Sequence, residues 1–406
     1  MAIWRSAISN RAPNDASTYF AAPENGTIRP VRLAVIGGGI NGAGIAWELA
    51  RRDYDVTLFE KGHCGAQTSS ATTKMIHGGL RYLERLHIAL VRESLRDRAW
   101  LLEHLPSLVK PIEILLPVYD DSPRSRFAIS AGLTVYDLLA GRANIARHKA
   151  LSADDLVARA PLMRAGLRGG FVYSDAQVDD YALARIVVGS AINDGAAVRE
   201  ETPVTSLRRD GKEWIVTTPA GSGRFDFVVN AAGPWMNALL AGNGIRSRYR
   251  LSLVRGSHLV LKQRVAEAGI LLQSISDRRV FFVLPWKGTT LVGTTEVMHH
   301  ASLEHVVATD DEIEYLITRF NRYVSQPVSR DDVASTFAGV RPLVGRAMNP
   351  SAIAREYRLE RRENLLNVFG GKMTTFRSMA KKAAMRVDNY FGKARTARPA
   401  NFIVSG

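Results

Sequence analysis

A glycine-rich turn near the start of the chain constrains the fold more than any other feature. Gly37, Gly39 and Gly42 form a G-x-G-x-x-G pattern between an apolar run at 32–36 and a helical pattern at 41–52. In such a turn the first glycine permits a tight bend, the second lets the backbone approach a pyrophosphate, and the third lets the helix pack closely on the strand. The phosphates lie at the positive N-terminus of the helix. The pattern therefore predicts an α/β fold with a parallel sheet and a bound dinucleotide.

An acidic residue stands where such a site needs one. Glu60 closes a second apolar run at 55–59, 18 residues after Gly42. A carboxylate at this distance can hydrogen-bond the ribose of an adenosine. The two runs and the helical pattern between them are typical of a first strand, helix, strand unit. These features leave open which dinucleotide is bound, because nicotinamide and flavin enzymes share them.

Charge and composition narrow the class of protein. The 406 residues include 54 Lys and Arg against 39 Asp and Glu, a net charge of +15, which favours anionic partners such as phosphorylated substrates or anionic lipid. We expect no nucleic acid partner and no metal, because the chain has no zinc-ligand spacing, no RNA-binding motif and no basic run interleaved with aromatic residues. A single cysteine, Cys64, fits a reducing compartment. No apolar segment is long enough to span a membrane, so we predict a cytoplasmic protein.

The length and the 46% of apolar residues suit two domains, and the patterns along the chain alternate between them. Strand patterns at 251–262, 280–285 and 289–293 predict an antiparallel sheet in the second domain. We predict a discontinuous nucleotide-binding domain from 31–110, 171–245 and 335–392, a second domain from 111–170 and 246–334, a disordered arm at 1–30 and a basic tail at 393–406.

Two late glycine turns favour a flavin over a nicotinamide, since a long cofactor needs backbone N–H groups along its whole length. The segment 69–84 strongly resembles the flavin-loop signature of FAD-dependent glycerol-3-phosphate dehydrogenases. The resemblance covers about residues 31–391. Further segments that agree with the family in the same order are 173–180, 230–235, 256–258, 285–286, 293–295, 339–343 and 370–377.

The resemblance implies an FAD-binding Rossmann-like domain of the glutathione-reductase/DAO type, with an inserted antiparallel-sheet substrate domain. It also implies that the secondary alcohol of glycerol 3-phosphate, or of a similar small phosphorylated polyol, is oxidised to the ketone by hydride transfer to flavin. Quinone or oxygen would then take the electrons. Two alternatives stay open: an oxidase of an amine or a 2-hydroxy acid, and a non-catalytic flavoprotein.

Site residues carry over position by position. Arg81, Arg341 and Lys372 match the family positions that line a phosphate pocket, and Tyr82 is a further candidate for contact with substrate. His77 and His258 are both candidates for the base, because imidazole titrates near neutral pH. The predicted catalytic set is Arg341, His77, His258 and Lys372. The predicted cofactor-binding set is Gly37, Gly39, Ile40, Asn41, Gly42, Glu60, Lys61, Thr68, Ser69, Ser70, Thr73, Lys74, His77, Gly78, Gly79, Val204, Ala232, Gly233, Trp235, Gly293, Arg341, Gly371, Lys372, Met373 and Thr374.

Two features depart from the family's pattern, and a third concerns the last predicted helix. Glu296 stands where the family usually has an aspartate, and we expect the family's C-terminal helical domain to be missing. The helical pattern at 374–391 is basic and amphipathic. It suits either an anionic membrane surface, at the inner face of the cell membrane, or packing on the nucleotide-binding sheet.

Overall fold

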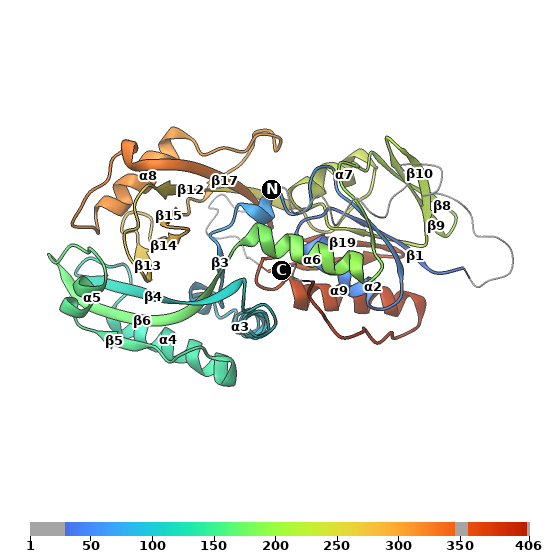
Figure 1. Cartoon of the computed structure of the whole chain (residues 1–406). Coiled ribbons are helices and arrows are strands. Elements are labelled where there is room, and N and C mark those ends of the chain that lie inside the picture. The colour runs from blue at the N-terminus through green and yellow to red at the C-terminus, as the bar shows by residue number, and fades with distance from the viewer. Residues whose placement is uncertain (1–28, 346–355, 404–406) are drawn as a thin grey trace.

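The computed structural model describes residues 29–345 and 356–403. Within these residues the chain forms a six-stranded, a three-stranded and a ten-stranded sheet. The two larger sheets lie in two parts side by side, as Figure 1 shows. The predicted disordered arm, apart from residues 29 and 30, lies outside the described residues.

The six-stranded sheet contains the glycine turn. Its strands in spatial order are β18 (Arg358–Arg362), β19 (Leu365–Phe369), β11 (Phe227–Asn230), β1 (Arg32–Ile36), β2 (Asp55–Phe59) and β7 (Ala197–Arg199). Only the pair of β18 and β19 is antiparallel among these described strands. Side chains alternate along a strand, so Leu33 and Val35 of β1 enter one core while Ala34 and Ile36 enter another. The predicted parallel sheet is confirmed.

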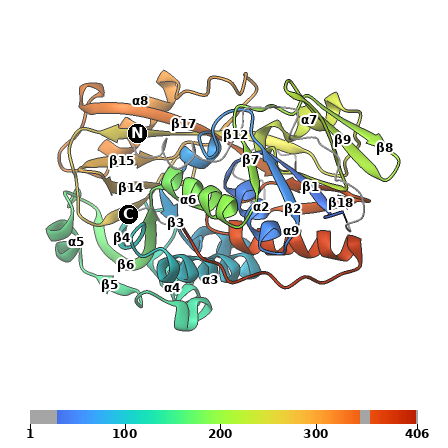
Figure 2. The same ribbon diagram turned by 45° about the vertical axis from the view of Figure 1, so that its right-hand side comes forward.

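Different layers cover the two faces of this sheet. The helices α2 (Ile40–Ala50), α6 (Asp180–Asn193) and α9 (Phe376–Phe391) share the core of Leu33 and Val35 (Figure 2). The small sheet β8 (Ser206–Asp210), β9 (Glu213–Thr218) and β10 (Gly221–Phe225) covers the other face. Asp226 separates β10 from β11. Its carboxylate accepts a 2.8 Å hydrogen bond from the Arg32 N–H.

The ten-stranded sheet forms the other part of the molecule and is mostly antiparallel. Its main path runs β16 (Val297–Met298), β12 (Leu251–Leu261), β15 (Thr289–Gly293), β14 (Val280–Trp286), β13 (Gly269–Gln273), β4 (Val109–Tyr119), β6 (Leu167–Val178) and β3 (Met75–Ile76), with β17 (Val333–Val344) beside β12 and β5 (Lys149–Leu151) beside β6. The exception is β13, which runs parallel to β4. The sheet is therefore antiparallel, as the sequence predicts, except at that one pair.

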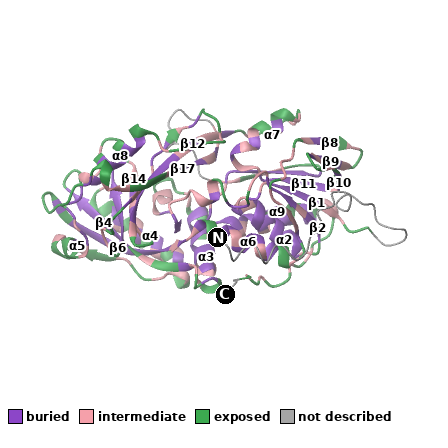
Figure 3. Ribbon diagram, turned by 45° about the horizontal axis from the view of Figure 1, so that its top comes forward, coloured by how far each residue is buried: buried purple, intermediate pink, exposed green. Residues whose placement is uncertain are grey.

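Helices cover both faces of the larger sheet. Leu316 and Phe320 of α8 (Asp310–Asn321) pack in one core, and Leu133 and Tyr136 of α4 (Arg126–Ala140) pack in another. Figure 3 shows buried residues throughout the centre of the molecule and exposed ones along the outer helices. The remaining helices are α3 (Ile88–His104), α5 (Ala153–Arg159) and α7 (Met236–Gly242), with short 3-10 helices η2 (Thr68–Ser70), η3 (Leu80–Arg85), η4 (Gly141–Ala143), η5 (Gly233–Trp235) and η6 (Arg330–Asp332).

Two long strands cross the predicted domain boundaries at residues 171 and 335. Both β6 and β17 belong to the ten-stranded sheet. The residues of β6 show no strand pattern, because the polar Ser174 and Asp175 are among its buried residues. The division of the chain into domains stays a prediction.

The final helix buries its apolar stripe inside the protein. Phe376, Ala380, Ala383, Ala384 and Val387 of α9 are all buried in the core that α2 shares. Packing on the sheet is therefore the correct alternative for this stripe, and it is not available to lipid. In the parts of the chain that the structure describes, no helix has the length and hydropathy needed to cross a membrane.

Candidate active site

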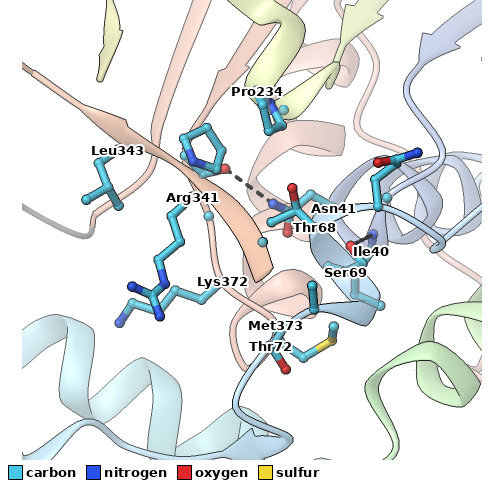
Figure 4. Close-up of a pocket in the computed structure, with 18 of the residues that line it drawn as sticks. Ile40, Asn41, Thr68, Ser69, Thr72, Pro234, Arg341, Leu343, Lys372 and Met373 are labelled. Carbon is cyan, nitrogen blue, oxygen red and sulfur yellow. Dashed lines mark hydrogen bonds between the residues drawn. The ribbon is translucent and has the colours of Figure 1, made fainter. Parts of the chain in front are cut away.

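A cavity of about 500 Å³ lies where the two larger sheets meet. Its wall includes the end of β1, the loop after β2, η3, the end of β15 and part of β17. Figure 4 labels side chains around it from the start of α2, the loop after β2, η5, β17 and the turn before α9. Of the predicted site residues, those on the cavity wall are Gly37, Gly39, Ile40, Asn41, Glu60, Lys61, Thr68, Ser69, Thr73, His77, Gly79, Arg81, Tyr82, Val204, Ala232, Gly233, Trp235, Gly293, Arg341, Gly371, Lys372, Met373 and Thr374.

The turn before α2 has room only for glycine at two positions. Gly37 has a φ of +102°, and a Cβ there would lie 2.5 Å from the Ala231 carbonyl oxygen. A Cβ on Gly42 would lie 1.9 Å from the Gly37 oxygen. The turn is closed by Glu60, whose carboxylate accepts a 2.6 Å hydrogen bond from the Gly38 N–H. This hydrogen bond fixes the turn, and the N-terminus of α2 faces the cavity. A helix N-terminus in this position can bind a pyrophosphate.

A second glycine turn meets the first at the start of α2. Gly370 and Gly371 have φ values of +75° and +110°. The Asn41 amide donates a 3.2 Å hydrogen bond to the Gly370 oxygen, and a Cβ on Gly371 would lie 2.3 Å from that amide nitrogen. Segments about 330 residues apart in the chain thus form one continuous wall. Such a wall fits an elongated dinucleotide held by backbone groups along its length.

Three cations and one carboxylate line the other end of the cavity. Arg341 Nη2 donates a 3.1 Å hydrogen bond to Thr294 Oγ1, and its Nη1 lies 3.9 Å from Glu296. Arg81 Nη2 lies 4.0 Å from the other oxygen of Glu296. Lys372 Nζ lies 3.7 Å from the centre of the Tyr82 ring. Figure 4 shows Arg341 and Lys372 extending alongside one another.

Arg341 keeps its charge despite its surroundings. Burial lowers the pKa of Arg341 to about 10, with a smaller lowering from Arg279 and an opposing effect from Tyr82. This pKa still lies well above neutral pH, so the guanidinium is charged there. A buried, charged guanidinium in a cavity is suited to bind an anion.

The two candidate histidines occupy different positions. His77 lines the cavity, and its backbone N–H donates a 3.2 Å hydrogen bond to Thr374 Oγ1. His258 is fully buried in β12, with its Nε2 3.0 Å from Thr73 Oγ1 and its ring stacked at 4.7 Å on Phe337. Burial, with the charges of Arg341 and Lys74, lowers the pKa of His258 well below its ordinary value. The structure thus places His77 at the cavity and His258 behind Thr73.

A sequence profile described as FAD dependent oxidoreductase (DAO) matches residues 32–384. The chain belongs to the FAD dependent oxidoreductase family. It is therefore an FAD-dependent oxidoreductase. The two glycine turns form a wall that suits this cofactor. The predicted fold class is confirmed with it.

Relatives of the chain include proteins named as dehydrogenases of phosphorylated polyols. The chain is 38% identical over 372 residues to D-erythritol 1-phosphate dehydrogenase of Brucella abortus (strain 2308), covering 88% of this chain and 74% of that enzyme. It is 36% identical over 376 residues to aerobic glycerol-3-phosphate dehydrogenase of Escherichia coli (strain K12), with the same two coverages. The structure of glycerol-3-phosphate dehydrogenase from Bacillus halodurans, complexed with FAD, superposes with a TM-score of 0.72 at 25% identity, covering 92% of this chain and 67% of that one.

Five predicted residues are not among the described residues that line the cavity of this family member: Gly42, Ser70, Lys74, Gly78 and His258. They support its wall instead. Lys74 Nζ lies 2.6 Å from Asp180 and donates a 2.7 Å hydrogen bond to the Ser70 oxygen. His258 and Gly256 both lie within β12 and not in a turn. Gly256 is required there for close contact, since a Cβ would lie 2.7 Å from Arg341 Nη2.

Sequence reasoning missed several wall residues. Phe282, Leu271, Pro203 and Tyr173 line the cavity, and Asp175 reaches it from β6. Apolar side chains of this kind carry no motif, so only the alternation of strand β14 pointed to Phe282. Asp175 lies in a segment that resembles the family, and that was the one signal for it.

Proposed function

We propose that the protein oxidises the secondary alcohol of a small phosphorylated polyol, such as glycerol 3-phosphate, to the ketone. The observation that carries this proposal is the convergence of Arg81, Arg341 and Lys372 on one end of the cavity. A phosphate dianion needs several fixed donors, whereas a single arginine suffices for a carboxylate. The names of the two relatives, an erythritol-phosphate and a glycerol-phosphate dehydrogenase, agree with a substrate of this class.

The chain's own residues then have distinct roles. Arg341, Arg81 and Lys372 bind the phosphate, and Tyr82, whose ring Lys372 contacts, closes the pocket beside them. Bound FAD would supply the acceptor for the hydride of the alcohol carbon. His77 accepts the proton of the hydroxyl group, so that a ketone remains. His258 acts as a positioning residue through Thr73, because its ring does not line the cavity.

The cofactor would lie along the wall that joins the two glycine turns. The N-terminus of α2, with Gly37, Gly39 and Ile40, would hold the pyrophosphate, and Glu60 the ribose. The residues Gly371 to Thr374 would direct N–H groups at the ring system. We propose quinone or oxygen as the final electron acceptor and a cytoplasmic location. Any contact with the inner face of the cell membrane must use a surface other than the apolar stripe of α9, which is buried.

Anaerobic reduction of the bound flavin tests this proposal. Purified protein is mixed with phosphorylated polyols, 2-hydroxy acids and amines, and loss of the visible flavin absorbance is recorded. We expect bleaching by a phosphorylated polyol alone, with strong loss of affinity in Arg341→Ala and partial retention in Arg341→Lys. Bleaching only by an amine or a 2-hydroxy acid would favour the oxidase, and no bleaching by any compound would favour a flavoprotein without this catalysis.

A further inference from the structure

Glu296 lies between the two arginines of the cavity. Its side chain is buried, with 5% of the residue exposed, and it lines the cavity wall. One carboxylate oxygen faces Arg341 Nη1 at 3.9 Å, and the other faces Arg81 Nη2 at 4.0 Å. Both distances exceed the 2.7–3.2 Å of an N–H to oxygen hydrogen bond. The Glu296 carboxylate therefore lies within ion-pair distance of both guanidinium groups, but beyond hydrogen-bond distance of these two nitrogens.

The backbone around Glu296 is rigid. The preceding residue, Thr295, is buried and donates a 2.6 Å hydrogen bond from its hydroxyl to Glu312. The Thr295 hydroxyl also accepts a 2.9 Å hydrogen bond from the Ser257 N–H. Arg279 donates a 3.2 Å hydrogen bond to the carbonyl oxygen of Glu296 itself. The carboxylate is thus presented to the cavity from a fixed support, as a recognition group must be.

A carboxylate at this place opposes the binding of a phosphate. Both groups are anions, and a phosphate held by Arg81 and Arg341 would lie close to Glu296 in a largely buried site, where charges are weakly screened. A hydroxyl group on the same ligand removes this conflict, because it donates a hydrogen bond to the carboxylate. A site that pairs cations with one buried carboxylate is therefore complementary to a ligand with both a phosphate and a free hydroxyl.

We propose that Glu296 is a specificity-determining residue that accepts a hydrogen bond from an unreacted hydroxyl of the substrate. The inference rests on the proposed function, in which His77 faces the hydroxyl that is oxidised and the arginines bind the phosphate. The hydroxyl left for Glu296 is then a further one on the carbon chain. The enzyme consequently selects phosphorylated triols and longer polyols over phosphorylated diols that lack this group.

A matched pair of substrates tests the inference. Glycerol 3-phosphate and propane-1,2-diol 1-phosphate have the same secondary alcohol and phosphate, but the second lacks the terminal hydroxyl. A hydrogen bond to a charged group corresponds to about a 10- to 100-fold preference. We expect a preference of that order for glycerol 3-phosphate in the rate of anaerobic flavin reduction at low substrate concentration. Glu296→Met, which removes the acceptor and keeps the length, should reduce the ratio close to one, whereas the exposed control Glu267→Met should keep it.

The affinity for inorganic phosphate is a second test of the inference, and it does not depend on catalysis. If Glu296 opposes the anion, Glu296→Gln should bind phosphate more tightly than the wild type, measured by the change in the flavin spectrum. Weaker phosphate binding in Glu296→Gln would overturn the inference, since Glu296 would then serve only to hold the arginines in place. An unchanged substrate ratio in Glu296→Met would also overturn it while leaving the proposed function standing. If neither substrate reduces the flavin, the proposed function fails and the inference fails with it.

Discussion

Arg98 Nη1 donates a 2.6 Å hydrogen bond to the carboxylate of Asp175, and the two residues are 0% and 2% exposed. Asp175 also accepts a 2.8 Å hydrogen bond from the Tyr136 hydroxyl, which in turn accepts one from the Gly78 N–H. This buried chain of contacts fixes the loop that carries His77 into the cavity. The ion pair therefore connects the stability of the fold to the geometry of the site.

Arg98→Met tests the stability of this pair. Removing the guanidinium leaves the Asp175 carboxylate buried without its counter-ion, and breaking such a pair lowers the free energy of unfolding by about 3–5 kcal/mol. Thermal denaturation with bound FAD measures the effect. The double variant Arg98→Met with Asp175→Asn should recover part of the loss, because no uncompensated charge remains. Equal losses in the single and double variants would contradict this explanation.

Gly42→Ala tests the glycine turn. The new methyl group would lie 1.9 Å from the Gly37 oxygen, so the helix must move away from the turn. We expect the purified variant to contain little or no flavin. Gly189→Ala in α6 is the matched control, because a Cβ there meets no atom within 4 Å among the described residues and the change favours helix. A fully yellow Gly42→Ala protein would refute the requirement for glycine.

The pKa of His258 predicts a contribution to acid sensitivity. Burial lowers this pKa well below the ordinary value of about 6.5. Below that pH the unfolded chain binds a proton that the folded chain does not, so stability falls as the pH falls, by up to about 1.4 kcal/mol per pH unit. Melting temperatures at pH 7.5 and 5.5 should therefore differ more for the wild type than for His258→Gln. An equal difference in both proteins would show that His258 does not titrate on unfolding.

The residues after α9 are held on α2 and α3 by aromatic contacts. Phe402 lies 4.8 Å from the ring of Trp47 and 5.2 Å from that of Trp100, and the Arg398 N–H donates a 2.8 Å hydrogen bond to Arg51. Two aromatic contacts of about 1 kcal/mol each imply that Phe402→Ala exposes this segment roughly thirtyfold more often. Trypsin should then cleave after Arg395, which precedes Thr396, correspondingly faster. The control Ile403→Ala, at a residue 43% exposed, should be cleaved at the wild-type rate.

The sequence predicted the fold best where an element depends only on neighbouring residues in the chain. The apolar run of β1 and the glycine pattern at the start of α2 depend only on local geometry, and the structure confirms both. β6 escaped prediction because Asp175 looks like a surface residue until Arg98, 77 residues away in the chain, is seen beside it. Long-range partners of this kind leave no local pattern.

The sequence predicted which cations line the cavity, but not which histidine faces it or how Glu296 lies between the arginines. The resemblance pointed to Arg81, Arg341 and Lys372, which the structure brings to one cavity. It did not distinguish His77 from His258, because a motif fixes which residues are near the site and not which side of a strand faces it. The role of Glu296 likewise depends on two distances across the cavity, to residues 215 and 45 positions away.

Anaerobic flavin reduction by glycerol 3-phosphate and by unphosphorylated glycerol, compared in one stopped-flow experiment, tests the central claim most directly. The claim is that Arg81, Arg341 and Lys372 bind the phosphate of a polyol whose alcohol is oxidised. It predicts rapid bleaching by glycerol 3-phosphate, negligible bleaching by glycerol, and loss of this difference in Arg341→Ala. Equal bleaching by both compounds in the wild-type protein would contradict the claim.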